Sequence, residues 1–219
     1  MQSHTRRLTC PKCLRPQRTC ICQWITPTEP AVEVLILQHP LEVDNAKGSA
    51  RLLHLSLLHS RLATGEVFAE DELQTLLHAP MPGQAIRHTI LLYPETPEDN
   101  GIDISDRPRA DQTLLKEPGR VRLVVLDGTW RKSRKMLFLN PSLQKLPRLP
   151  LRNMPASQYL IRKAHRPDQL STLEATCYAL MQLEEDTEKY LPLLNAFNGF
   201  VAQQAGYSMP DQERLTESS

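Results

Sequence analysis

The stretch VRLVVLDGTWRKSRK, from Val121 to Lys135, decides the fold class because it joins a buried strand directly to a helix. Its first half is a continuous aliphatic and β-branched run, which is typical of a central parallel strand buried on both faces. Its second half, from Trp130 to about Leu139, has the pattern of a helix. A buried strand followed at once by a helix indicates an α/β domain.

Strands and helices alternate along the rest of the chain. The other expected strands are Val32–Gln38, a short one at Glu66–Phe68, one at 88–94 and one at 157–164. The other expected helices lie in the segments 47–62, Asp71–Leu77, 170–186 and 190–207. The acidic, turn-rich residues 95–114 are expected to form an exposed excursion. Together these elements predict a mostly parallel sheet flanked by helices.

The composition describes a globular protein with one main core. The chain has 219 residues, of which 40% are hydrophobic and 23% are charged. This length suits one well-packed domain with a small appendage. No run of about eighteen or more apolar residues occurs, and no apolar stretch follows the basic N-terminal residues, so neither a membrane span nor a signal peptide is expected. We therefore expect a cytoplasmic protein with no membrane partner.

The net charge of +1 hides a strong segregation of charge along the chain. Residues 1–22 carry five lysines and arginines and no acid, and residues 120–166 carry twelve against Asp127 alone. If both basic segments fold onto one face, that face would attract a polyanion such as a nucleic acid. The alternative is that both are ordinary solvated faces.

Four of the five cysteines fall within the short segment CPKCLRPQRTCIC, as Cys10, Cys13, Cys20 and Cys22. Two close pairs joined by a short loop can surround one ion tetrahedrally with four thiolates. A reducing cytosol argues against disulfides. The pattern therefore predicts a structural Zn²⁺, because four cysteine ligands leave no open coordination position. A redox pair, an iron-sulfur cluster and metal-free thiols stay open as alternatives, since the CxC pair is tighter than the usual CxxC.

These features divide the chain into three parts. We expect a four-cysteine zinc knuckle at residues 1–28, the main α/β domain at 29–208 and a flexible tail at 209–219. The knuckle would hold the basic N-terminal segment rigidly against the main domain. Cys177 lies in a helical pattern and is expected to be a buried structural thiol.

Three polar loops are expected to meet at one edge of the sheet, because ligands bind beyond the carboxyl ends of parallel strands. The loops are QHPLEVDNAKGSAR after the first strand, LDGTWRKSRK after the central one, and RKAHRPDQLSTLEA after the last one. No GxGxxG follows the first strand and no GxxxxGK[ST] occurs, so neither a dinucleotide cradle nor a P-loop is supported.

Four motifs in this order, CPKCLRPQRTCIC, QHPLE, LDGTW and LSTLEA, carry a resemblance to a known family. The chain resembles the DTW-domain family, named for its Asp-x-Thr-Trp motif, and within it the bacterial tRNA-uridine aminocarboxypropyltransferases. The resemblance extends from Cys10 to at least Ala175. A lone DxTW would be weak, whereas four ordered motifs are specific.

The resemblance implies a SPOUT-like α/β fold with a C-terminal knot that binds S-adenosylmethionine. Knots are almost absent from proteins in general, so residue patterns alone would not predict one. The implied activity is transfer of the 3-amino-3-carboxypropyl group of this co-substrate to N3 of a tRNA uridine, in bacteria the variable-loop position 47. The products would be acp3U and methylthioadenosine. The implied partner is tRNA and not DNA, and the chain would be a monomer or a homodimer.

The catalytic residues that the resemblance implies are Asp127, Thr129, Trp130 and His39. Asp127 would take the N3 proton or hold the uracil edge, and its charge favours a nearby sulfonium; alternatively, it caps the following helix. Thr129 would bond a ligand carboxylate or cap that helix. Trp130 offers a ring for stacking, but a tryptophan is as often a core anchor. His39 is a second acid-base candidate or a structural residue that ends the strand.

Two further sets of site residues follow from the matched motifs. The expected co-substrate site comprises Leu126, Asp127, Gly128, Leu170, Ser171, Thr172, Glu174 and Ala175. Amides at a helix N-terminus suit the methionine carboxylate, although Ser171 and Glu174 also fit a plain capping box. The expected tRNA contacts are Glu42, Lys47, Arg51, Arg131, Lys132, Arg134, Lys135 and Arg162. Some of these cations would contact phosphates and the others would be solvated.

Two rival functions stay open. A SPOUT-type methyltransferase would use the same co-substrate, and the sequence does not show which carbon of the sulfonium faces the nucleophile. A non-catalytic zinc-knuckle RNA-binding protein would keep the basic surface without any chemistry.

Overall fold

The computed structural model describes residues 8–80, 85–94, 111–151 and 170–207. Within these residues the chain forms a five-stranded sheet in the order β2-β1-β4-β3-β5, and every neighbouring pair is parallel. The strands are β1 (Glu33–Gln38), β2 (Ser60–Thr64), β3 (His88–Leu92), β4 (Val121–Asp127) and β5 (Arg148–Leu149). The α/β class and the parallel sheet predicted from the sequence are therefore confirmed.

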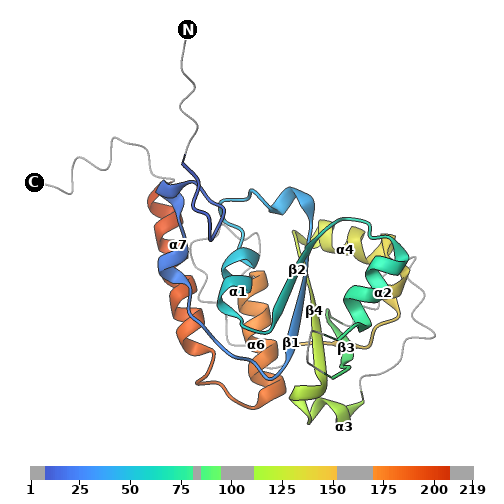
Figure 1. The fold of residues 1–219 in the computed structure, drawn as a ribbon. Helices are drawn as coiled ribbons and strands as arrows, with labels where there is room; N and C mark the ends of the chain where they lie inside the picture. The colour runs from blue at the N-terminus through green and yellow to red at the C-terminus, as the bar shows by residue number, and fades with distance from the viewer. Residues whose placement is uncertain (1–7, 81–84, 95–110, 152–169, 208–219) are drawn as a thin grey trace, which may run out of the picture.

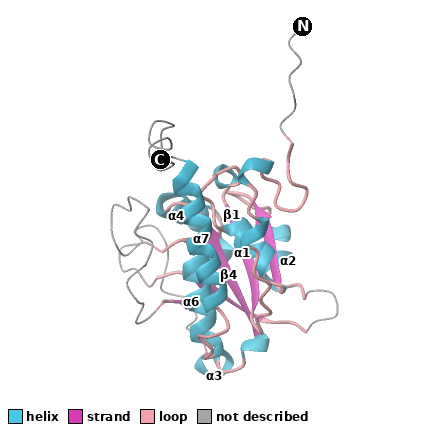
Figure 2. Cartoon of the chain, turned by 90° about the vertical axis from the view of Figure 1, so that its left-hand side faces the viewer, coloured by secondary structure: helices cyan, strands magenta, loops and turns pink. Residues whose placement is uncertain are grey.

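Helices cover both faces of the sheet (Figure 1). They are α1 (Ala50–Ser56), α2 (Glu70–His78), α3 (Gln112–Leu115), α4 (Trp130–Leu139), α5 (Pro141–Gln144), α6 (Thr172–Glu184) and α7 (Leu191–Tyr207). Short 3-10 turns lie at Gln17–Thr19, Cys22–Trp24, Pro40–Glu42 and Pro118–Arg120. Figure 2 shows α6 and α7 in front of the strands, on the face opposite to α2. No helix in the described part of the chain is long and apolar enough to span a membrane.

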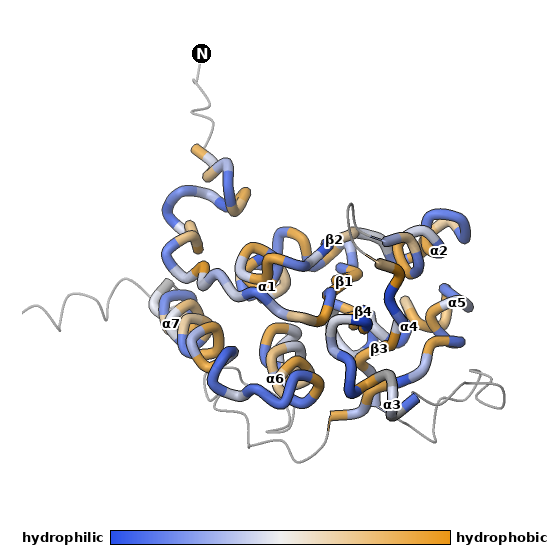
Figure 3. Tube along the Cα trace, turned by 60° about the horizontal axis from the view of Figure 1, so that its bottom comes forward, coloured by the Kyte–Doolittle hydropathy of each residue, from blue (hydrophilic) through white to orange (hydrophobic). Residues whose placement is uncertain are grey.

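Two apolar clusters, one on each face, hold the sheet between its helices. In β4 all seven residues are buried, as the sequence predicts. Leu123 and Val125 pack in the cluster with α1, α6 and α7, whereas Val124 and Leu126 pack in the cluster with α2, α4 and α5. This alternation follows from the period of two in a strand. Figure 3 shows apolar and polar residues interspersed along the covering helices.

The predicted strand at Glu66–Phe68 is wrong. The structure places a strand earlier, at Ser60–Thr64, where the sequence pattern predicts the end of a helix; α1 ends at Ser56 instead. This strand lies at the edge of the sheet and is only partly buried, so its sequence lacks the apolar run by which buried strands are found. Phe68 is buried in the loop before α2, where its N–H donates to Asn140 Oδ1 at 3.0 Å.

Several predictions concern the C-terminal half of the sheet. The bounds of β4 and α4 agree with the prediction, and Cys177 is fully buried as expected. The short elements β5 and α5 were not predicted, because each has four residues or fewer. The predicted strand at 157–164, most of the predicted excursion at 95–114 and the tail at 209–219 lie outside the described residues, and the described residues do not show a knot.

The described part of the N-terminal segment, residues 8–28 and here called the knuckle, packs on the last helix (Figure 1). The ring of Trp24 lies so close to Gly199 on α7 that a Cβ at that position would overlap with the ring. Trp24 Nε1 donates to Gln203 Oε1, which also accepts from Gln23 Nε2 at 3.2 Å. Glycine at position 199 is thus what lets the knuckle dock.

A buried charge cluster, which the sequence did not predict, lies at the amino ends of the strands. Glu33 at the start of β1 accepts a bidentate pair of hydrogen bonds from Arg122 of β4, at 2.8 and 3.1 Å, and both side chains are fully buried. Arg61 donates to the same carboxylate at 2.8 Å, and Arg87 lies 3.7 Å from it. Arg122 and the buried Arg148 therefore do not belong to the basic surface expected from residues 120–166.

Candidate active site and metal centre

The carboxyl ends of the strands bring Asp127 together with two polar residues from other segments. Its carboxylate Oδ2 accepts from Gln38 Nε2 at 2.9 Å, and Oδ1 accepts from Thr172 Oγ1 at 2.7 Å. Gln38 ends β1, and Thr172 begins α6. Asp127 is only 5% exposed, so these bonds fix its orientation in a largely dehydrated place. The predicted meeting of the three polar loops at one edge is confirmed for the described residues.

The start of α4 has its own cap, so Asp127 does not serve as one. Thr129 is the N-cap residue, and its side chain accepts the N–H of Lys132 at 3.4 Å. The alternative in which Asp127 caps this helix is therefore wrong. At Gly128, an added Cβ would lie 3.1 Å from Lys132 Cβ and 3.6 Å from His39 Cβ. Its lack of a side chain lets the first turn of α4 approach the end of β1.

The start of α6 is a complete capping box. Ser171 Oγ accepts the N–H of Glu174 at 3.2 Å, and Glu174 Oε2 accepts the N–H of Ser171 at 2.8 Å. The N–H of Leu173 donates to Ser49 Oγ at 3.3 Å. Three of the four amides at residues 171–174 thus have partners among the described residues.

His39 is buried and uses both of its ring nitrogens. Nδ1 accepts the N–H of Leu41 at 3.1 Å, so the proton of the neutral ring lies on Nε2, which is 2.8 Å from Glu66 Oε1. Glu66 Oε2 lies 2.9 Å from Lys135 Nζ. Hydrogen bonds from Lys135 and His39 lower the pKa of the Glu66 carboxyl below its usual value. These contacts agree with the expectation that His39 is a structural residue at the end of the strand.

Among the described residues, acids from neighbouring loops lie against Lys132 and Lys135 of α4. Lys132 Nζ lies 2.7 Å from Glu42 Oε1, and Asn45 Nδ2 donates to Glu42 Oε2 at 2.7 Å. Lys135 forms a similar ion pair with Glu66, at 2.9 Å. Arg131 and Arg134 are exposed on this helix. The basic cluster after β4 therefore serves partly to bind the loops that follow β1 and β2.

Trp130 stacks on an aromatic ring that the sequence motifs did not indicate. Its ring centroid lies 5.1 Å from that of Tyr93, with 16° between the planes. Tyr93 is buried just beyond β3, and the Arg148 guanidinium lies 4.8 Å from its ring centroid. Trp130 is 50% exposed, so it is not a core anchor and it can stack with a further ring.

The other predicted site residues are more scattered. Leu126 is buried in the core, Lys47 is exposed, and Arg51, Leu170 and Ala175 are half-buried. Arg162 lies outside the described residues. The prediction missed Gln38, Tyr93 and Ser49. Gln38 and Tyr93 lie at or just beyond a strand's carboxyl end, so the rule that ligands bind there would have found them.

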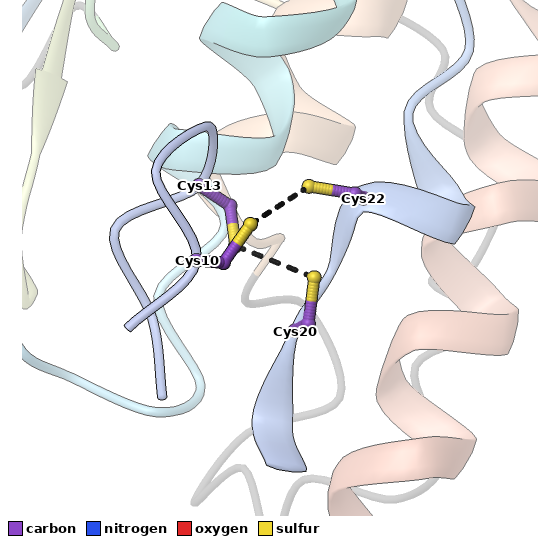
Figure 4. A group of neighbouring side chains, drawn as sticks. All are labelled: Cys10, Cys13, Cys20 and Cys22. Carbon is purple, nitrogen blue, oxygen red and sulfur yellow. Dashed lines mark hydrogen bonds between the residues drawn. The ribbon is translucent and has the colours of Figure 1, made fainter. Parts of the chain in front are cut away.

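The four cysteines of the knuckle form a cluster that fits one metal ion. Their sulfur atoms all lie within 4.8 Å of one another, and Figure 4 shows the side chains pointing into a common space. The pairs Cys10–Cys22 and Cys13–Cys20 are separated by 3.6 and 3.7 Å. A tetrahedral ion with Zn–S bonds of about 2.3 Å separates its sulfurs by roughly 3.8 Å. A multi-iron cluster would hold the sulfurs further apart, because its own width lies between them.

The thiol groups differ in acidity. Backbone amides of Cys13 and Lys12 lower the pKa of Cys10 to about 6. Burial raises the pKa of Cys22 to about 12. An ion bound by all four sulfurs would therefore displace at least the proton of Cys22.

The chain is an α/β protein with a buried carboxylate at the carboxyl end of a central parallel strand, which is where proteins of this class generally bind ligands. Comparison with known families is more specific. The model of the DTW domain matches residues 7–205, so the chain belongs to the DTW domain family.

Three curated relatives are each named tRNA-uridine aminocarboxypropyltransferase 2. The protein of Macaca fascicularis is 27% identical over 97% of this chain and 70% of its own length. The protein of Mus musculus is 30% identical over 96% of this chain and 69% of its own length. The protein of Drosophila melanogaster is 30% identical over 84% of this chain and 69% of its own length. No solved structure gives a significant match.

Proposed function

We propose that this protein transfers the 3-amino-3-carboxypropyl group of S-adenosylmethionine to N3 of a uridine in tRNA, forming acp3U and methylthioadenosine. The uridine at position 47 is the proposed acceptor. The observation that carries the proposal is the arrangement of Asp127 with Gln38 and Thr172 within the DTW motif region. The family and the names of its relatives supply the reaction class.

In the proposed reaction, Asp127 takes the proton of uracil N3. The nitrogen then attacks the methylene carbon next to the sulfonium, a new N–C bond forms, and the C–S bond breaks with its electron pair going to sulfur. Hydrogen bonds from Gln38 and Thr172 fix the orientation of this carboxylate.

The co-substrate is proposed to lie along the edge formed by β4 and the start of α6. The negative charge of Asp127 would stabilise the sulfonium, and the Thr172 N–H would meet the methionine carboxylate. The exposed face of Trp130 would stack with adenine or uracil, because its other face is taken by Tyr93. A C-terminal knot of the SPOUT type is part of this proposal.

The tRNA is proposed to contact the exposed cations near this edge. Arg131 and Arg134 project from α4, and Lys47 lies on the loop after β1. Phosphate contacts of this kind fix the position of a nucleic acid without reading its sequence. Lys132 and Lys135 are bonded to carboxylates, so a phosphate would have to compete for them.

The metal is proposed to be a structural Zn²⁺ bound by Cys10, Cys13, Cys20 and Cys22. It would supply cross-links within the knuckle, which has little apolar core of its own. Metal analysis of the purified protein tests this assignment. We expect one zinc ion per chain; iron in place of zinc, or no metal with retained knuckle structure, would contradict it.

The reaction is tested by incubating purified protein with tRNA and S-adenosylmethionine labelled in either its carboxyl or its methyl carbon. Mass spectrometry of the nucleosides should find the carboxyl label in a modified uridine and no methyl label. Methyl label in the RNA would make the protein a methyltransferase. Absence of both labels, with tRNA still bound, would leave a non-catalytic RNA-binding protein. A tRNA carrying cytidine at position 47 is the control for the acceptor.

A further inference from the structure

Arg15 belongs to the knuckle, but its guanidinium reaches into the loop that follows β1. That loop, residues 39–49, is called the first rim loop below. Arg15 Nη1 donates to the carbonyl oxygen of Ala46 at 2.7 Å. Nη2 donates to the carbonyl oxygens of Gly48 at 2.9 Å and Asn45 at 3.4 Å. One side chain thus satisfies three backbone acceptors of a single loop.

Arg15 also contacts the last helix. The carbon of its guanidinium lies 5.2 Å from the ring centroid of Phe200, which is buried on α7. Burial lowers the pKa of Arg15, and the nearby charge of Cys13 opposes this shift. The guanidinium therefore connects the cysteine cluster, the last helix and the first rim loop.

The first rim loop carries groups that shape the candidate active site. Glu42 on this loop bonds Lys132 of α4 at 2.7 Å. Ser49, at its other end, accepts the N–H of Leu173 at the start of α6. Movement of the loop would therefore release contacts on both sides of Asp127.

We propose that Arg15 is a positioning residue that couples the folded knuckle to the first rim loop and, through that loop, to the active site. A lysine would keep the charge, but its single ammonium group lacks the planar fork that reaches several carbonyls at once. A bound divalent ion with four thiolates would carry a net negative charge and would thus favour the guanidinium beside it. The kinetic consequence of this inference and the metal-removal test rest on the proposed function and its metal, whereas hydrogen exchange in the Arg15 variants does not.

Hydrogen exchange of the full chain without substrates tests the coupling directly. Arg15→Lys and Arg15→Met are compared with the wild type and with Lys12→Met, which removes a charge from the knuckle but no described loop contact. Because each Arg15 variant loses hydrogen bonds from a charged donor, amides of residues 42–49 should exchange at least about tenfold faster. The melting temperature of the main domain and the metal content should stay near the wild-type values.

Unchanged exchange in residues 42–49 of both Arg15 variants would overturn the inference. Arg15→Met could also lose the metal. In that case, hydrogen exchange of Arg15→Lys decides whether the inference holds, because this variant keeps the charge and the aliphatic stem. Removing the metal from the wild type should also speed exchange in the loop, and an unaffected loop would overturn the connection to the knuckle.

Kinetics separate this inference from the proposed reaction. The KM for tRNA should rise by about tenfold in the Arg15 variants while kcat changes less, because the loop is displaced and no reacting group is removed. Equal losses in Lys12→Met would mean that only charge matters, which contradicts a positioning role. If no product forms in any variant, the proposed function fails, but the exchange result still decides the role of Arg15.

Discussion

The two ends of the sheet each bury a carboxylate, but they surround it differently. At the amino end, Glu33 is bonded by Arg122 and Arg61, with Arg87 nearby. At the carboxyl end, Asp127 accepts hydrogen bonds from the amide of Gln38 and the hydroxyl of Thr172, at the edge where the polar loops meet. We therefore expect the Glu33 carboxylate, which is held by arginines, to serve stability, and the Asp127 carboxylate, which lies where parallel sheets bind ligands, to serve chemistry.

The largest difference between the two ends should appear when Asp127 is changed to Asn. Activity should fall by about 10²–10⁴-fold, the range for loss of a general base. The fold should persist, because an asparagine can accept from Gln38 and donate to the Thr172 hydroxyl. Product formation and thermal melting measure the two effects. The control is Asp44→Asn, an exposed aspartate of the first rim loop, and a similar loss there would refute the assignment.

Glu33→Gln should lower the stability of the fold and leave the activity almost unchanged, which is the reverse of the effect expected for Asp127→Asn. It leaves the buried Arg122 without its counter-charge, so the free energy of unfolding should fall by about 3–5 kcal/mol. Activity per folded molecule should stay near the wild-type level. Urea denaturation is the measurement, with Glu117→Gln as the control, because its exposed ion pair with Arg120 contributes only about 0–1 kcal/mol. If Glu33→Gln lost activity but not stability, the proposed difference between the two ends of the sheet would be wrong.

Thr172→Val tests whether the hydroxyl orients Asp127. Loss of a hydrogen bond to a charged group costs roughly 1.5–3 kcal/mol, so kcat/KM should fall by about tenfold or more. Thr172→Ser keeps the hydroxyl and should restore most of the activity. Equal activity in Thr172→Val and the wild type would show that Asp127 needs no such support.

The smallest expected effect concerns the ion pair of Glu66 and Lys135 at the carboxyl end. Lys135→Met should raise the pKa of Glu66 towards its usual value, because Lys135 is the main cause of the lowered pKa. Since the folded pKa is lowered, these contacts stabilise the protein above the unfolded pKa and are lost as the pH falls through the folded pKa. Carbon NMR of the Glu66 carboxyl measures the shift. Arg131→Met, which removes a charge from the same helix, should leave that pKa almost unchanged.

Strong local patterns explain the parts of the fold that the sequence predicts well. The buried run of β4 and the start of α4 follow from consecutive apolar residues and from Thr129 as a cap. The capping residues Ser171 and Glu174 likewise mark the start of α6. β2 was missed because an edge strand with few apolar residues depends on its neighbour for pairing.

Partners distant in sequence explain the parts of the site that were missed. Arg122 was counted with the basic surface, and only the position of Glu33, 89 residues earlier, shows that it is buried. Gln38 is separated from Asp127 by the same number of residues. The motifs predict which loops meet, but the choice of partner for each polar group depends on the packing of the whole domain.

The contact of Trp24 with Gly199 has a consequence for synthesis of the protein. The knuckle leaves the ribosome before any strand of the sheet, whereas α7, on which it docks, follows all of them. During translation the cysteines can therefore bind metal early, but the knuckle has no docking surface until α7 is made. A chain that stops before α7 would leave Arg15 without Phe200, so this contact forms only after the last helix has been made.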